Sequence, residues 1–217
     1  MKERKILTIE TSGELCSIAL VYNENKFDER NILMKHIHSE KLIPMIESIL
    51  TSNNIKAKDL NLIAVSNGPG SFTGLRIGMT VAKGIAFAAN LPIIPIPTFE
   101  ALALEISSFL PDSQTFCIIN NANSEECYFS KYETEGNTFK TLIENSLVKK
   151  EELKNKIDAE NLIYGNYQFN NNVKNICSPR ATSLAKWIYL FGEDLVTLDY
   201  DYLEPNYLKK FKVKTKQ

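Results

Sequence analysis

The stretch SNGPGSFTGLRIGMTVAKG, residues 66–84, is the most informative segment of this chain. An apolar run of strand length, residues 60–66, comes before it. Residues 73–90 have the composition of a long helix, and another strand-like run, residues 91–96, follows them. A strand, a glycine-rich turn, a helix and a second strand in this order predict a βαβ unit with parallel strands, and therefore an α/β fold.

Three strands and one helix are predicted before this unit. Short alternating or apolar runs between polar turns predict the strands, at residues 5–10, 15–22 and 27–34. In residues 39–50, apolar side chains recur at positions i, i+3, i+4 and i+7, which predicts an amphipathic helix. Ser39 is a suitable N-cap for this helix.

A turn with the sequence Pro-Asp-Ser, residues 111–113, is the expected boundary between two lobes. Before this turn, Thr98 is placed to cap a helix over residues 99–109. Beyond it, we predict strands at 115–120, 126–132, 138–146 and 162–164, a loop at 166–175 and a helix at 181–191. We therefore expect an N-terminal lobe, residues 1–110, that carries the glycine-rich loop, and a C-terminal lobe, residues 111–217.

The charges of the 217 residues are balanced, with 25 Lys and Arg, 26 Asp and Glu, and a net charge of -1. A domain that binds nucleic acid by itself is usually basic, so this balance argues against that class. The four cysteines show no CxxC spacing and predict reduced thiols in a cytoplasmic protein. The longest stretch of low charge, residues 77–99, contains Lys83 and three prolines, so no membrane-spanning helix is expected.

The glycine-rich loop has two interpretations. Free amides at the start of a helix attract an anion, so the loop and the end of the first strand form a candidate phosphate-proximal or nucleotide-proximal site. Its residues are Glu10, Ser12, Gly68, Gly70, Ser71 and Thr73. The glycine spacing fits neither the dinucleotide fingerprint nor a Walker loop. On spacing alone, a tight turn without a ligand is the favoured interpretation.

Small residues recur at every fourth position of the predicted long helix. Glycine inside a helix costs about 1 kcal/mol relative to alanine, so repeated glycine indicates that another backbone comes very close. That backbone belongs either to a sheet of the same chain or to a second helix. Arg76 and Lys83 share another face of this helix, where they are either solvated or meet acidic groups of a partner. The small residues are Gly74, Gly78, Ala82 and Ala86.

The sequence offers no set of side chains for catalysis or metal binding. His36 and His38 lack a third ligand nearby, and the chain contains no HxxxH motif. Ser12, Ser66 and Ser71 have no accompanying His/Asp pair, which argues against a serine nucleophile. We therefore predict no catalytic residue, no metal site and no cofactor.

Several motifs together resemble the TsaB (YeaZ) family, whose members help to make threonylcarbamoyladenosine in tRNA. The motifs are GPGSFTGLRIG at 68–78, AKG at 82–84, IETS at 9–12, HSEKLIPMI at 38–46 and EPNYLKK at 204–210. The central motif is long and specific, and the resemblance extends over nearly the whole chain.

This resemblance implies a two-lobed α/β fold of the actin, sugar-kinase and heat-shock ATPase type, which is ribonuclease H-like, with mixed sheets flanked by helices. It implies a non-catalytic scaffold that pairs with TsaD, the enzyme that transfers the threonylcarbamoyl group to the adenosine next to the anticodon. An ATPase, TsaE, joins the two, and tRNA is reached only through the complex. TsaD uses an HxxxH metal site, which this chain lacks.

The family's pairing surface is formed by its first two helices, which match residues 39–50 and 73–90 here. We expect the apolar stripe of the first helix to be largely exposed in the isolated chain, so that Met45→Asp should leave the monomer folded. Without its partner, the same surface is expected to allow a homodimer. The expected interface residues are Leu42, Met45, Ile46, Ile49, Gly74, Gly78 and Ala82.

Two departures from the family pattern bear on function. Glu10 stands where the family usually has Asp, and residues 121–128, NANSEECY, stand where it has DARRGEVY. An ATP-dependent phosphotransferase or ATPase of the same fold is the alternative function. It needs acidic residues in both lobes, whereas the second lobe offers Asn120 and Asn121, which favours the scaffold.

Five lysines lie close together at the end of the chain. A solvated tail is the favoured interpretation, and a weak patch that attracts tRNA is the alternative. They are Lys209, Lys210, Lys212, Lys214 and Lys216.

Overall fold

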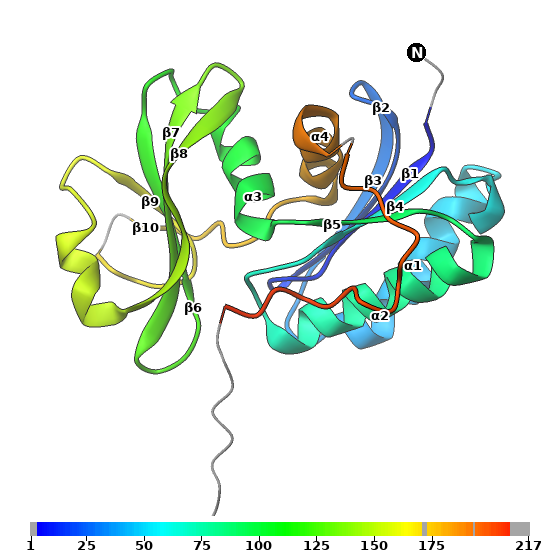
Figure 1. Ribbon diagram of the computed structural model, residues 1–217, viewed down its shortest axis with the longest axis horizontal. Helices are drawn as coiled ribbons and strands as arrows, with labels where there is room; N and C mark the ends of the chain where they lie inside the picture. Colours follow the sequence, from blue (N-terminus) through cyan, green and yellow to red (C-terminus); the bar gives the residue numbers. More distant parts are fainter. Residues whose placement is uncertain (1–3, 171–172, 193, 209–217) are drawn as a thin grey trace, which may run out of the picture.

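The computed structural model describes residues 4–170, 173–192 and 194–208, which form two lobes, each built on a mixed five-stranded sheet (Figure 1). The strand order of the first sheet is β3-β2-β1-β4-β5. Its strands are β1 (Ile6–Glu10), β2 (Leu15–Asn23), β3 (Lys26–Leu33), β4 (Leu62–Ser66) and β5 (Ile93–Ile96). β1, β2 and β3 pair antiparallel, whereas β4 pairs parallel with both β1 and β5, which confirms the predicted βαβ unit.

The second sheet repeats this pattern with the order β10-β9-β6-β7-β8. β6, β7 and β8 pair antiparallel, whereas β9 pairs parallel with both β6 and β10. Its strands are β6 (Thr115–Asn121), β7 (Glu126–Glu135), β8 (Thr138–Lys149), β9 (Leu162–Tyr164) and β10 (Val173–Lys174). The prediction of an uninterrupted loop over residues 166–175 was therefore wrong, because β10 pairs with β9 at the edge of the sheet.

Helices cover both faces of the first sheet (Figure 1). α1 (His38–Ser52) and α2 (Phe72–Ala89) pack on one face, against Leu7 and Ile9 of β1. α4 (Ala181–Phe191) packs on the other face, against Ile6. This alternation follows from the two-residue period of a strand and explains why β1 is buried throughout.

α3 (Thr98–Ser107) joins the two lobes, because it packs against α4 on one side and against the second sheet on the other. Leu104 belongs to the cluster around α4, whereas Phe99 and Leu102 pack with Phe116 and Tyr132 of the second sheet. Two short 3-10 helices complete the described elements, η1 (Ala57–Asp59) and η2 (Lys150–Asn155). These contacts give the mixed sheets flanked by helices that the sequence predicts.

Two predicted helix caps were wrong. α1 begins at His38 with Ile37 as its N-cap, which makes no side-chain cap, so Ser39 lies inside the helix. Thr98 is the first residue of α3, and its hydroxyl instead accepts a hydrogen bond from the Gly68 amide at 3.0 Å. The Thr98 side chain therefore fixes the glycine-rich loop to the start of α3.

The predicted C-terminal lobe, residues 111–217, needs correction because α4 lies on the first sheet. The chain then continues along β5 and α2 as an extended segment, residues 197–208, which we name the strap (Figure 1). Ile93 and Thr197 exchange two backbone hydrogen bonds, and the Tyr200 hydroxyl donates to the Leu91 carbonyl at 2.6 Å. The exposed edge of β5 explains this return, since an unpaired edge strand binds further backbone.

Within the described ranges, none of the helices combines the length and the apolar character that crossing a membrane requires. The five lysines between residues 209 and 216 lie outside the described residues.

Candidate functional site

The glycine-rich loop, residues 67–71, is packed against the turn that follows β1. A Cβ atom added at Gly70 or Gly74 would overlap the backbone of Ser12 or Thr11, respectively. The Ser71 amide donates to the Ser12 carbonyl at 2.7 Å. The close backbone predicted from the glycine pattern is therefore that of the same chain.

The start of α2 is capped by its own loop. Ser71 is the N-cap, and its hydroxyl accepts a hydrogen bond from the Gly74 amide at 3.2 Å. The Thr11 hydroxyl donates to the Gly74 carbonyl at 2.8 Å, so the turn after β1 also holds the first turn of α2. These contacts satisfy polar groups in the first turn of α2 from within the chain.

Glu10 is fully buried at the end of β1. One carboxylate oxygen accepts a hydrogen bond from the Ser12 amide at 2.5 Å, while the other has no hydrogen-bond partner among the described residues. Burial raises the pKa of Glu10 from 4.5 to about 7, because desolvation disfavours the charged form. A carboxyl group that is partly protonated near neutral pH and closed off from solvent is poorly suited to hold a cation.

A cleft of about 1790 Å³ separates the two lobes. Its first-lobe wall contains four residues of the predicted phosphate-proximal set, whereas Glu10 and Gly68 are not part of the lining. The Ser12 side chain is buried, and its hydroxyl has no hydrogen-bond partner among the described residues. The four lining residues are Ser12, Gly70, Ser71 and Thr73.

The second-lobe wall of the cleft carries asparagines, and these side chains hold loops together. The Asn120 side chain donates to the Cys177 carbonyl at 2.6 Å and accepts from the Asn166 amide at 3.1 Å. The Asn166 side chain in turn accepts from the Asn121 amide at 2.7 Å. Asn123 caps the β6–β7 turn by accepting from the Glu125 amide at 2.9 Å. The end of β6 therefore carries amides, which do not act as acids or bases, while the carboxylates of this wall, Glu125 and Glu126, lie in and after the β6–β7 turn.

The predicted exposure of the α1 stripe was wrong. Leu42, Met45, Ile46 and Ile49 all belong to the core of the first lobe, and Met45 is only 7% exposed. The helical pattern located the apolar face correctly, but the first sheet of the same chain covers that face. Met45→Asp would therefore place a charge in the core, and the prediction that this variant stays a folded monomer was wrong.

The small residues of α2 also face inward. Gly74, Gly78 and Ala82 are buried, and a Cβ atom at Gly78 would overlap the Thr11 hydroxyl. Gly84 is different, because it is exposed and an added Cβ would meet nothing within 4 Å. Nothing in the described chain explains a glycine there, although it lies inside the helix.

The sides of α1 and α2 that point away from the sheet carry exposed residues, and we name these sides together the outer helical face. It contains Ile43, which is 54% exposed although it is large and apolar. α1 and α2 lie side by side on the sheet, as Figure 1 shows. The outer helical face consists of Glu40, Ile43, Pro44 and Glu47 of α1 and Thr73, Arg76, Thr80 and Gly84 of α2.

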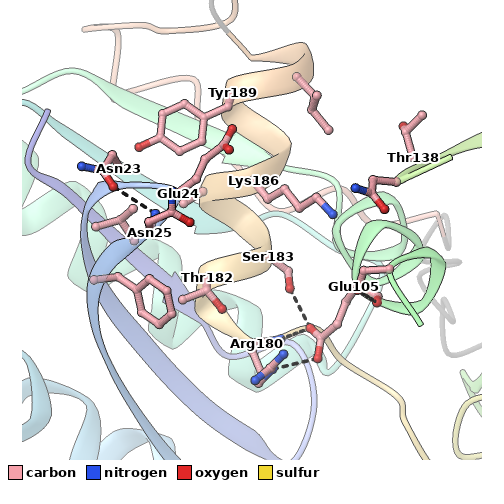
Figure 2. Close-up of a pocket in the computed structure, with 16 residues that line it drawn as sticks. Asn23, Glu24, Asn25, Glu105, Thr138, Arg180, Thr182, Ser183, Lys186 and Tyr189 are labelled. Atoms are coloured by element: carbon pink, nitrogen blue, oxygen red, sulfur yellow. Dashed lines mark hydrogen bonds and ion pairs between the residues drawn. The ribbon is translucent and has the colours of Figure 1, made fainter. Parts of the chain in front are cut away.

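A second pocket, of about 590 Å³, lies beside α4 (Figure 2). Figure 2 shows Glu105 and Arg180 pointing toward each other, with a distance of 2.9 Å between Oε1 and Nε. The other Glu105 oxygen accepts from the Arg180 amide and from the Ser183 hydroxyl, each at 2.7 Å. Glu29 accepts from the Thr182 amide at 2.9 Å. These carboxylates from distant elements cap α4, so sequence-local cap patterns gave no sign of them.

The described part of the chain contains no group of three or more His, Cys, Asp and Glu residues that could hold a metal ion. His38 is buried, and its Nε2 lies 3.3 Å from the Leu15 carbonyl oxygen, whereas His36 is exposed. Burial lowers the pKa of His38, so its ring is neutral near pH 7.

Comparisons with a family model, with curated proteins and with solved structures agree on one family. A family model described as TsaD, tRNA N6-adenosine threonylcarbamoyltransferase, matches residues 32–198. The tRNA threonylcarbamoyladenosine biosynthesis protein TsaB of Haemophilus influenzae is 36% identical over 131 residues, which are 60% of this chain and 55% of that protein. The TsaB protein of Escherichia coli is 34% identical over 133 residues, 61% of this chain and 57% of that protein.

The matched segment thus spans little more than half of these curated relatives. A solved structure described as YeaZ from Pseudomonas aeruginosa superposes with a TM-score of 0.77 at 23% identity, covering 94% of this chain and 100% of that chain. That likeness establishes the fold, which is the two-lobed ribonuclease H-like type. The chain therefore belongs to the family that the TsaD model describes and, within it, to the TsaB (YeaZ) family.

Proposed function

We propose that this chain is a non-catalytic subunit that pairs with a TsaD-like threonylcarbamoyltransferase during formation of threonylcarbamoyladenosine next to the anticodon of tRNA. The observation that carries the proposal is the inter-lobe cleft. Its glycine-rich loop packs against the chain's own Thr11–Ser12 backbone, and hydrogen-bonded asparagines occupy the end of β6 on the opposite wall. Family membership supplies the reaction in which such a subunit takes part.

The pairing role is assigned to the outer helical face. The seven residues predicted from sequence are buried beneath it, where they fix the two helices on the sheet. Ile43 supplies exposed apolar area, and Gly84 leaves room for a close approach of a second helix.

The remaining partners follow from the same proposal. A TsaE-like ATPase joins the pair, and tRNA is contacted through the assembled complex, in keeping with the net charge of -1. In the absence of the catalytic subunit, the outer helical face pairs with a second copy of itself around a two-fold axis. The assembly works in the cytoplasm, where the tRNA substrate is found.

An ATP-dependent phosphotransferase or ATPase is the second candidate, and the large cleft is the observation that favours it. Such an enzyme needs carboxylates that bind the metal ion accompanying ATP. Glu10 is the first-lobe candidate, but it is buried and is not part of the cleft lining.

Reconstitution separates the two candidates. The chain is mixed with the TsaD-like protein, the TsaE-like ATPase and the substrates of the reaction, and modified adenosine in tRNA is quantified with and without the chain. ATP hydrolysis by the chain alone is measured in parallel. We expect modification to require the chain and the chain alone to show negligible hydrolysis. Robust ATP hydrolysis that disappears in Glu10→Ala would show that the chain is an enzyme and refute the proposed scaffold role.

A further inference from the structure

Arg76 is held in a fixed position at the edge of the outer helical face that adjoins the strap. Its guanidinium carbon lies 3.9 Å from the centroid of the Phe72 ring. Its Nε donates a hydrogen bond to the Tyr207 hydroxyl at 3.0 Å. The centroids of the Phe72 and Tyr207 rings are 5.0 Å apart, so α2 and the strap restrain the arginine together.

The charge of Arg76 is not neutralised by the described part of the chain. The residue is exposed, and no Asp or Glu oxygen among residues 4–170, 173–192 and 194–208 lies within ion-pair distance of its guanidinium. A guanidinium has five donors in a planar fork. Because Tyr207 uses Nε, the two Nη groups stay available for a bidentate contact with a carboxylate.

Lys83, the other cation of α2, has a different role. Its ammonium group donates to the Leu203 carbonyl in the strap at 3.2 Å, and the residue is half-buried. Lys83 therefore ties the strap to the helix, whereas Arg76 is oriented by the strap and keeps its charge toward solvent. Arg76 and Lys83 lie on the same face of α2, so a Lys83 variant is a suitable control for an Arg76 variant.

We propose that Arg76, presented by Phe72 and Tyr207, anchors the complex by binding a carboxylate of the TsaD-like subunit. The inference rests on the proposed function, because it requires that subunit on the outer helical face. A pre-positioned arginine loses little side-chain freedom on binding, and it favours a planar carboxylate over other acceptors. Arg76 thereby sets the register of the partner at one end of α2, while Ile43 and Gly84 supply packing.

A protein carboxylate fits this surface better than a phosphate of tRNA. Nucleic-acid surfaces gather several cations, because affinity grows with each phosphate neutralised. The outer helical face instead exposes the acidic residues Glu40 and Glu47 of α1, and the strap exposes Glu204. A single cation among acidic groups repels a polyanion but still accepts one well-placed carboxylate.

The test measures the affinity of the full chain for the purified TsaD-like protein by calorimetry, at low and at physiological salt. The variants are Arg76→Ala, Arg76→Lys and the control Lys83→Ala, each checked for folding by circular dichroism. We expect Arg76→Ala to weaken binding by about tenfold or more and to reduce its salt dependence. Arg76→Lys keeps the charge but loses the bidentate geometry, so its affinity should be intermediate. Lys83→Ala should bind like the unmodified chain.

Three other outcomes of the binding test would each refute a different part of the proposal. If the unmodified chain binds and Arg76→Ala binds equally well with the same salt dependence, the anchor is refuted while the proposed function stands. If the unmodified chain does not bind at all, the proposed function and the anchor fall together. If Arg76→Ala binds the subunit normally but weakens capture of tRNA by the assembled complex, the group bound by Arg76 is a phosphate and the carboxylate is refuted.

Discussion

Replacing Gly84 with alanine should stabilise the isolated chain and at the same time weaken its complex with the TsaD-like subunit. Gly84 lies inside α2, and an added Cβ meets no heavy atom within 4 Å. Alanine is favoured over glycine in a helix interior by about 1 kcal/mol, and nothing in the monomer opposes this gain. For a chain of this size, the gain corresponds to a rise in Tm of about 2–4 °C.

Gly78→Ala is the matched control in the same helix. A Cβ at this position would overlap the Thr11 hydroxyl, which donates to the Gly74 carbonyl at 2.8 Å. The turn after β1 has to move to relieve that overlap, and overpacking of this kind costs about 1–3 kcal/mol. The cost cancels or exceeds the gain in helix propensity, so Gly78→Ala should melt at a lower temperature than Gly84→Ala.

Thermal and urea denaturation followed by circular dichroism give the stabilities, and calorimetry gives the affinity for the TsaD-like subunit. A Gly84→Ala variant that melts below the unmodified chain would show that the space beside Gly84 is not open. A Gly84→Ala variant that binds the subunit with unchanged affinity would show that no helix packs closely there, because a closely packed helix has no room for the added methyl group.

Three further predictions follow from buried groups. Met45→Asp should lower the free energy of unfolding in urea by about 3–5 kcal/mol because it places an unpaired charge in the core, whereas Ile43→Asp, at a position 54% exposed, should change it by less than about 1 kcal/mol. As the pH rises from 5 to 8, Glu10→Gln should gain up to about 3 kcal/mol of stability relative to the unmodified chain. The reason is that burial raises the pKa of Glu10 from 4.5 to about 7, so the native unmodified chain has to give up a proton in this range. Equal pH profiles of the two proteins in urea denaturation would contradict this. Glu105→Ala should destabilise the chain by about 2–4 kcal/mol in the same assay, since it removes the cap of α4 and the partner of Arg180, and an unchanged midpoint would show that the cap is dispensable.

The direction of the Glu10 effect follows from proton linkage. Between pH 4.5 and pH 7 the native carboxyl binds more protons than the unfolded one, so the contribution of Glu10 to stability falls as the pH rises through this window. Above pH 7 both states are ionised, and the full cost of the buried charge is present. The Gln variant has no such proton, which makes it the control for all other titrating groups.

Local patterns were enough to predict most elements of the fold. The apolar runs around the loop at residues 67–71 predicted β4, α2 and β5, and the order of these elements predicted the parallel pairing. The glycine pattern of α2 correctly indicated a close backbone. It did not identify which backbone, because spacing in one helix carries no information about the turn after β1 that packs against it.

The errors arise from contacts between residues far apart in the sequence. An apolar stripe such as that around Met45 is equally compatible with a partner or with the chain's own sheet, and only the tertiary fold decides between them. The return of α4 and the strap to the first lobe has no local signal, because it is fixed by carboxylates such as Glu105 and by backbone pairing at β5. The Arg76–Tyr207 contact joins residues 131 positions apart for the same reason.

The dissociation constant of the complex with a TsaD-like subunit, measured for the unmodified chain and for Ile43→Asp, shows whether the outer helical face is the binding surface. The variant loses the isoleucine side chain that the complex would bury, and its new charge has to be desolvated on binding. Together these two effects should weaken binding by about tenfold to a hundredfold. We predict that the unmodified chain binds and that Ile43→Asp, folded and with unchanged Tm, binds at least tenfold more weakly. Equal dissociation constants for the two proteins, or no binding by the unmodified chain, would contradict the account.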